Sequence, residues 1–157
     1  MNKYKMKQIK KILLGLFLII AFVICFIACQ DENNDVENLI GTWHLIEIKK
    51  DGQLINIQYD SSIVQQHNLT SNDFYNVTFN EDGNIQSIAF SNTIDAKYEV
   101  NGNRIRVYDV LSTQVLSSFQ SDSIFLSGIC TVNSYNINSS VLLLFSESLR
   151  ITLKLRR

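Results

Sequence analysis

The sequence predicts an α+β fold, in which a mostly antiparallel sheet curls toward a barrel and one late helix packs on it. Three observations predict this fold: apolar and polar residues alternate in short segments, turn signals separate the segments, and one late stretch has helical spacing. The 157 residues are 46% apolar and have a formal net charge of −1. This composition excludes a disordered chain, and the small net charge argues against nucleic-acid binding.

Three turn signals divide the first part of the predicted sheet into hairpins. They are Asp51-Gly52, Asp82-Gly83 and Asn101-Gly102. Asp-Gly and Asn-Gly pairs favour a type I′ turn, because both central residues of that turn adopt positive φ. The sequence therefore predicts a hairpin at each pair.

The segments around these turns alternate with a period of two, which predicts strands with one buried face. The apolar residues expected on the buried face are Ile55, Ile57 and Tyr59; Tyr75, Val77 and Phe79; Ile94, Ala96, Tyr98 and Val100; Ile105 and Val107; and Ile151, Leu153 and Leu155.

Two segments are apolar without this alternation. Residues 43–48 place Trp43 and Leu45 on one face and Ile46 and Ile48 on the other, which predicts a first strand that is apolar on both faces. Residues 141–145 are apolar throughout, as is typical of a central strand.

Two further stretches are not strand-like. Residues 61–69 fit either a short helix or a loop. Residues 122–132 predict a helix with Ser121 as its N-cap. Its apolar residues recur at helical spacing: Phe125, Ile129 and Val132. Gly128 lies inside this helix and weakens it by about 1 kcal/mol relative to Ala.

The first residues have the layout of an export signal. Residues 1–11 carry five Lys and no acid, and residues 12–28 are apolar except for Gly15. A basic start followed by a short apolar run is typical of a secretory signal peptide. The run is shorter than the roughly 20 residues that a membrane-spanning helix needs. The alternative interpretation is an uncleaved signal anchor.

Cys29 is the predicted lipidation site. Phe26-Ile27-Ala28-Cys29 resembles a bacterial lipobox, in which a small residue precedes the Cys that is acylated; Phe26 departs from the usual Leu. Cys25 does not fit, since bulky Ile24 precedes it. Two or more acyl chains make a stable membrane anchor. We therefore predict a signal peptide over 1–28, an acidic tether over 29–37 and a folded domain over 38–157.

The tether bears on where the protein is located. Asp31, Glu32, Asp35 and Glu37 resemble the signal that exports some Gram-negative lipoproteins to the cell surface, although a solvated tether explains them more simply. Loss of residues 1–28 removes five of the 14 bases and none of the 15 acids, which leaves a net charge of −6. We expect a protein of the bacterial envelope, anchored to the outer membrane.

The remaining cysteine is expected to be inert. If Cys25 leaves with the signal and Cys29 is acylated, Cys130 stands alone in an apolar stretch. A buried thiol is a better interpretation than a nucleophile, and no internal disulfide can form.

The order of these segments resembles the META domain (HslJ-like) family. The resemblance is carried by the Gly-x-Trp-x-Leu element in residues 39–45, the segments 79–83 and 98–102, Ser112-Thr113, and the closing residues 125–135 and 141–145. Many members have a Cys before Asn, where this chain has Ser91-Asn92, and a Cys after Ser-Thr. A role tied to that cysteine pair therefore does not carry over.

The resemblance implies a compact α+β domain with a barrel-like sheet, in envelope lipoproteins linked to stress tolerance or drug resistance without an established reaction. Its expected core anchors here are Trp43, Phe79, Tyr98, Phe125 and Tyr135. A Gly-x-Trp strand start is also a feature of lipocalin-like barrels. A helix over 122–132, before the last two strands, favours the META interpretation, whereas a hairpin there favours a lipocalin-like barrel.

Motifs that carry chemistry are not recognisable in the sequence. His44 and His67 are far apart, and His44 fits a hydrogen-bonded histidine of the core or rim better than a catalytic base. Residues 80–84 lack the spacing of a calcium loop and fit a turn. We expect no catalytic residue, metal site or cofactor.

Three functions fit this sequence. The favoured one is a monomeric, non-catalytic envelope lipoprotein that contacts a protein partner in stress tolerance or envelope maintenance. The alternative is a binder of a small apolar ligand, lipid or drug, inside the curled sheet, which needs a cavity of at least roughly 300 Å³. The third is a hydrolase built around His44, which needs a second titratable group nearby.

Overall fold

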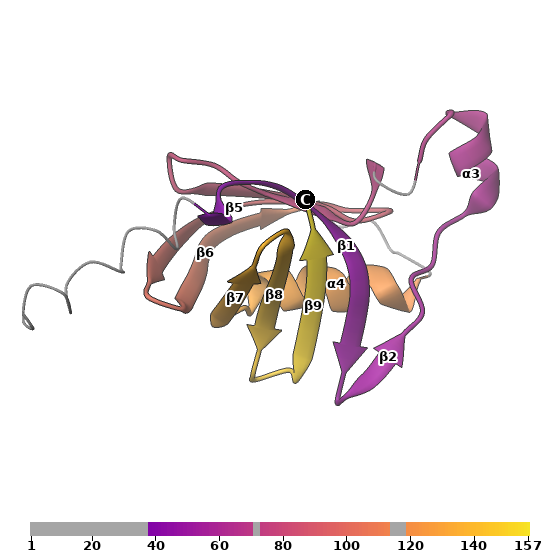
Figure 1. Cartoon of the computed structure of the whole chain (residues 1–157). Helices are drawn as coiled ribbons and strands as arrows, with labels where there is room; N and C mark the ends of the chain where they lie inside the picture. Colours follow the sequence, from indigo (N-terminus) through magenta and orange to yellow (C-terminus); the bar gives the residue numbers. More distant parts are fainter. Residues whose placement is uncertain (1–37, 71–72, 114–118) are drawn as a thin grey trace, which may run out of the picture. The chain divides into compact units, whose positions relative to one another are not determined.

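A computed structural model describes residues 38–70, 73–113 and 119–157 (Figure 1). The predicted signal peptide, Cys29 and the tether lie outside these residues. The elements are β1 (Gly41–Lys50), β2 (Gln53–Ile55), α3 (Ser61–Gln66), β3 (Asn76–Phe79), β4 (Asn84–Ile88), β5 (Thr93–Asn101), β6 (Arg104–Ser112), α4 (Gln120–Cys130), β7 (Ser134–Asn138), β8 (Val141–Ser146) and β9 (Ile151–Arg156). No helix among the described residues is both long enough and apolar enough to cross a bilayer.

Eight of the strands form a closed antiparallel barrel. The order is β1-β3-β4-β5-β6-β7-β8-β9, and pairing of β9 with β1 closes the ring. β2 is an extra strand that pairs only with the end of β1, at residues 48–50. The predicted fold class, a curled antiparallel sheet with one late helix, is confirmed.

A β-bulge corrects the prediction that the first strand is apolar on both faces. The register of β1 against β9 shifts between Leu45 and Glu47. Trp43 and Leu45 face inward before the shift, and Ile48 faces inward after it, opposite Leu153. Ile46 is the extra residue and is 38% exposed. A bulge inserts one residue without a partner, so the period of two changes phase there.

The three predicted hairpins all form, but their turns differ. Only Asp51-Gly52 has positive φ at both residues, 51° and 77°, as a type I′ turn requires. At the β3–β4 turn, Gly83 alone has positive φ, and its N–H donates to the Asn80 carbonyl at 3.1 Å. Residues 80–84 thus form a turn, as expected.

The two helices refine the sequence prediction. α3 begins after Asp60, whose carboxylate accepts the Ser62 N–H at 2.8 Å. α4 begins two residues earlier than expected, with Phe119 at the N-cap, so Ser121 lies inside its first turn. The prediction of Ser121 as N-cap was wrong, because its hydroxyl bonds to residue 58 instead. α4 precedes three strands rather than two.

Gly128 is explained by the packing of α4 on the inner face of β9. A Cβ at this position would lie 2.9 Å from Ile151 Cγ2 and 3.1 Å from Leu153 Cδ1. Both side chains belong to the buried core. Gly128 therefore lowers the helix propensity of α4 relative to Ala, but it allows the helix to pack closely against the sheet.

Substitution of Gly128 tests this packing. Ala gains about 1 kcal/mol in helix propensity, but overpacking a core costs about 1–3 kcal/mol. We expect Gly128→Ala to lower the free energy of unfolding by about 1 kcal/mol and Gly128→Val to lower it further, measured by urea denaturation. Ser123→Ala, at an exposed position of α4, is the control. A more stable Gly128→Ala would contradict the packing argument.

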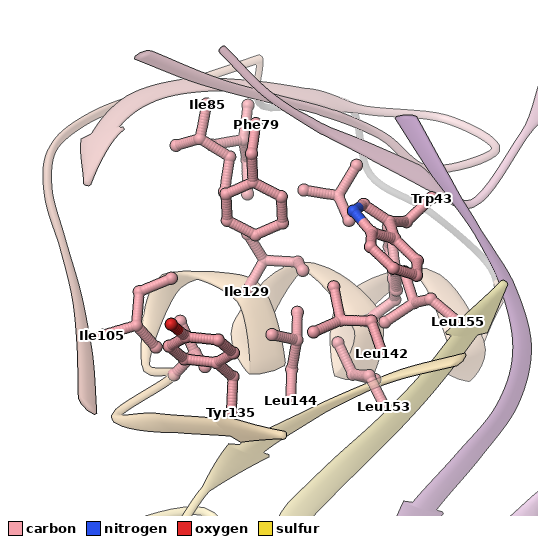
Figure 2. Close-up of a cluster of buried hydrophobic side chains, with 14 of the residues drawn as sticks. Trp43, Phe79, Ile85, Ile105, Ile129, Tyr135, Leu142, Leu144, Leu153 and Leu155 are labelled. Atoms are coloured by element: carbon pink, nitrogen blue, oxygen red, sulfur yellow. The ribbon is translucent and has the colours of Figure 1, made fainter. Parts of the chain in front are cut away.

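The core fills the space enclosed by the barrel and α4. Figure 2 shows Phe79 and Ile85 from one side of the sheet approaching Ile129 of α4 and Leu144 from the other. All four side chains are at most 1% exposed. Protein interiors pack at crystal-like density, so side chains rather than solvent occupy this region.

Candidate functional site

The five predicted anchors lie in the core and form no site. Trp43, Phe79 and Phe125 are fully buried, and Tyr98 and Tyr135 are 7% and 4% exposed. The rings of Phe79 and Tyr98 meet edge to face, with centroids 5.1 Å apart. Such pairs stabilise a core beyond the area that they bury.

Trp43 is held by both ends of the described domain. Its Nε1–H donates to the Leu39 carbonyl at 2.8 Å. The Arg157 guanidinium lies 4.5 Å from the Trp43 ring and donates to the carbonyls of Asn38 and Ile40. Gly41 has a φ of +122°, which L side chains rarely adopt. The Gly-x-Trp element thus forms a clamp between the start of β1 and Arg157.

The two histidines are not brought together. His44 is half-buried on β1, paired in register with Asn76 and Arg156, and its Nδ1 has no hydrogen-bond partner within the described ranges. Its half-buried position agrees with the expected rim histidine, although Nδ1 lacks the expected hydrogen bond. His67 is exposed just after α3. Across the described part of the chain, no group of three or more His, Cys, Asp or Glu could hold a metal ion.

Cys130 lies at the last position of α4 and is half-buried. Burial raises the pKa of its thiol, so the thiolate is disfavoured near neutral pH. This is the environment of an unreactive thiol.

A buried polar cluster around Asp122 was missed by the sequence prediction. Asp122 is fully buried in the first turn of α4. Its Oδ1 accepts from the Tyr75 hydroxyl at 2.7 Å and from the Phe90 N–H at 3.0 Å, and its Oδ2 accepts from the Ser91 N–H at 2.9 Å. The partners lie more than 30 residues away, so no local pattern in the sequence points to them.

Ser121 and Tyr75 extend the cluster to the segment after β2. The Gln58 N–H donates to Ser121 Oγ at 3.0 Å, and the Tyr75 hydroxyl lies 2.6 Å from the Gln58 carbonyl. Tyr75 Oη and Ser121 Oγ are 2.8 Å apart. These bonds join α4, the β4–β5 loop and the segment after β2, so the cluster acts as a structural junction.

The junction makes stability sensitive to alkaline pH. Burial, reinforced by Asp122, raises the pKa of Tyr75 above its ordinary value. The unfolded chain therefore releases this proton first, and the stabilisation is complete below about pH 10 and decreases as pH rises above it. Burial also raises the pKa of Tyr98 and of Cys130, which act in the same direction.

We expect the free energy of unfolding, measured in urea, to fall between pH 8 and pH 10.5, and to fall less in Tyr75→Phe. Tyr59→Phe, at a side chain that is 47% exposed, should keep the full decrease. An unchanged decrease in Tyr75→Phe would contradict the assignment.

The barrel wall is least complete between β6 and β7. These strands share one pair in register, Arg104 with Ser134, and two flanking backbone bonds, from Ile105 N–H to Asn133 O at 3.3 Å and from Tyr135 N–H to Asn103 O at 2.9 Å. An open groove of about 580 Å³ lies at this seam. We call it the seam groove; it is lined by residues 99–101, 104–107 and 131–133.

Other depressions of the described residues lie on outer surfaces of the sheet. One of about 660 Å³ crosses β1, β7, β8 and β9, and one of about 410 Å³ crosses β4, β5 and β6. Their lining is mostly polar side chains that point away from the core, such as Lys154 and Gln86. The seam groove differs from both in its position, because it lies where two neighbouring strands share only one pair in register.

Comparisons with known proteins agree with this architecture. A DUF4847 family protein from Bacteroides vulgatus has a TM-score of 0.52 and 19% identity, over 75% of this chain and 92% of that one. A protein from Burkholderia xenovorans has a TM-score of 0.56 and 12% identity, over 78% and 85%. These likenesses concern the fold. No curated protein matches the sequence. The family model of the META domain matches residues 35–157, and the chain therefore belongs to the META domain family.

Proposed function

We propose that this chain is an envelope lipoprotein, anchored through acylated Cys29, whose META domain acts by contacts with other molecules and not by catalysis. Its role is envelope stress tolerance or maintenance, and its partner is an envelope protein. The basic, apolar and small-residue layout of residues 1–29 supports the anchor.

The filled interior of the barrel is the main support for a domain that acts through contacts on its outer surface. α4 places Phe125 and Ile129 between the walls of the barrel, where both are fully buried. The surfaces left for a partner are therefore on the outside. The alternative, a small apolar ligand enclosed by the curled sheet, has less support, because these side chains occupy that space.

The arrangement of polar groups supports a non-catalytic role. Asp122, the fully buried acid, has both oxygens engaged by backbone and tyrosine donors. His44 lies on a different element from the Asp122 cluster. A general base needs a reacting proton within hydrogen-bond reach, and the Asp122 oxygens already accept from Tyr75, Phe90 and Ser91.

The anchor is tested by intact-mass analysis of protein from membranes. We expect loss of residues 1–28 and a mass increase from acyl chains on Cys29. Cys29→Ala should carry no acyl chains, whereas the matched Cys25→Ala should be processed and acylated normally. Full-length, unmodified protein, or an acylated Cys29→Ala variant, would overturn the anchor.

The envelope role is tested by survival of cells that lack the protein during exposure to detergent. We expect sensitive cells, rescue by the Cys25→Ala protein and no rescue by the Cys29→Ala protein. Equal survival with and without the protein would overturn a role in stress tolerance.

A further inference from the structure

The seam groove gives solvent access to residues that belong to the inner row of the barrel. Val100 is paired with Ile105, which is 3% exposed, and Val107 is paired with Tyr98, which is 7% exposed. Both valines are nevertheless half-buried rather than buried, and both line the groove. The short β6–β7 pairing explains this, since β7 pairs in register with β6 only at Arg104 within the described residues, while β5 covers the other edge of β6.

The rim of the seam groove is positively charged. Arg106 pairs with Glu99 at 3.2 Å and lies over the Tyr108 ring at 5.4 Å. Arg104 has no ion-pair partner in the ranges that the structure describes, although it lines the same groove. The groove thus has one cation in excess over its acid, beside an apolar wall of Val100 and Val107.

We propose that the seam groove binds an anionic amphiphile, with an acidic head group at Arg104 and Arg106 and an apolar body against Val100 and Val107. Its volume of about 580 Å³ lies within the roughly 300–1,000 Å³ of small-molecule sites. Guanidinium groups form charge-assisted bonds with carboxylates and phosphates. A neutral apolar ligand would cover Arg104 without a partner, which is unfavourable.

On charge alone, the predicted acidic tether also matches the seam groove. The predicted tether carries four acids close to Asn38, but it offers one aliphatic side chain, Val36, for the apolar wall. The amphiphile matches both the charge and the valines, so it is the occupant that the groove fits. The site lies beyond the proposed function, and neither depends on the other.

Photo-crosslinking of the full chain in membranes tests the proposal. The probe is dodecanoate with a diazirine on its tail, and crosslinked peptides are mapped by mass spectrometry. We expect crosslinks within residues 99–107 and 131–133, competed by unlabelled dodecanoate or dodecyl phosphate and not by dodecanol. Preference between the two competitors distinguishes a carboxylate from a phosphate head group, and either preference supports the site.

Matched variants separate binding from folding. Loss of a charged hydrogen-bond partner changes affinity about tenfold or more, so Arg104→Gln should lower the crosslinking yield by about that factor. Arg150→Gln, at an exposed arginine that pairs with Asp51 at 3.3 Å, should leave it unchanged. Both substitutions are at exposed residues, and unaltered thermal unfolding checks that each variant is folded.

Four results would overturn the proposal. Crosslinks elsewhere would exclude the groove, and equal competition by dodecanol would exclude recognition of an acidic head. Competition by inorganic phosphate as strong as by dodecyl phosphate would reduce the site to an anion site. Crosslinks that appear only after Asp31, Glu32, Asp35 and Glu37 are changed to amides would show that the tether occupies the groove.

Discussion

Replacing Asp122 with alanine is expected to lower the free energy of unfolding by about 3–5 kcal/mol, because each buried donor that loses its acceptor costs about 1–3 kcal/mol. The substitution would leave the N–H groups of Phe90 and Ser91 without the acceptor that now lies 2.9–3.0 Å away. The Tyr75 hydroxyl would lose a partner as well. Buried donors without acceptors carry their full desolvation cost. Urea denaturation at neutral pH measures the change.

Two controls make the Asp122 result specific. Asp122→Asn keeps the shape and one acceptor oxygen, so its loss should be smaller than that of alanine. Asp95→Ala removes an exposed acid of β5 that accepts a bond from Gln86 at 3.0 Å, and surface changes of this kind are usually within about 0.5 kcal/mol. A loss below about 1 kcal/mol for Asp122→Ala would mean that the junction is not a main source of stability.

Trp43→Ala is expected to cost about 3–5 kcal/mol, the range for truncating a large buried aromatic residue. The indole is fully buried, and its loss would also remove the bond to Leu39 and the surface on which Arg157 lies. The matched control is Ile46→Ala, three residues further along β1. Because Ile46 is the bulge residue and 38% exposed, its truncation should cost much less than the 2–5 kcal/mol typical of a buried Ile.

Comparison of Ile46→Ala with Ile48→Ala tests the bulge directly. An uninterrupted period of two would bring Glu47 to the inner face and Ile46 and Ile48 to the outer face. Equal losses for Ile46→Ala and Ile48→Ala would therefore contradict the register shift. A loss confined to Ile48→Ala supports it, since Ile48 is fully buried.

Most of the fold could be predicted because it depends on local patterns. Turn pairs such as Asp51-Gly52 and the alternation of residues 94–100 are readable within ten residues, and both predictions are confirmed. The bulge at Ile46 could not be predicted, because an inserted residue looks the same as a strand that is apolar on both faces. The need for glycine at position 128 could not be predicted either, since it depends on side chains of β9 more than 20 residues away.

The candidate sites were less predictable than the fold. The Asp122 junction joins residues from four separate parts of the chain, and none of them carries a recognisable motif. The seam groove depends on where β7 stops pairing with β6, which is a property of the sheet register. The alternation of Arg104 and Arg106 with Ile105 and Val107 was visible in the sequence, but it indicated only a strand with one buried face.

The clamp between Arg157 and Asn38 has a consequence for how the domain folds. Among the described strand pairings, β1 with β9 spans the longest stretch of chain, from residues 44–50 to residues 151–156. Most other pairings join consecutive strands. Closing a longer loop costs more entropy, so ring closure should come late in folding. A circular permutant that links residue 157 to residue 38 and opens the chain at the Asp82-Gly83 turn would make this pairing local and the β3–β4 pairing long-range, so we expect the late step of refolding to move from β1–β9 to β3–β4, as measured by stopped-flow refolding of variants in each pair.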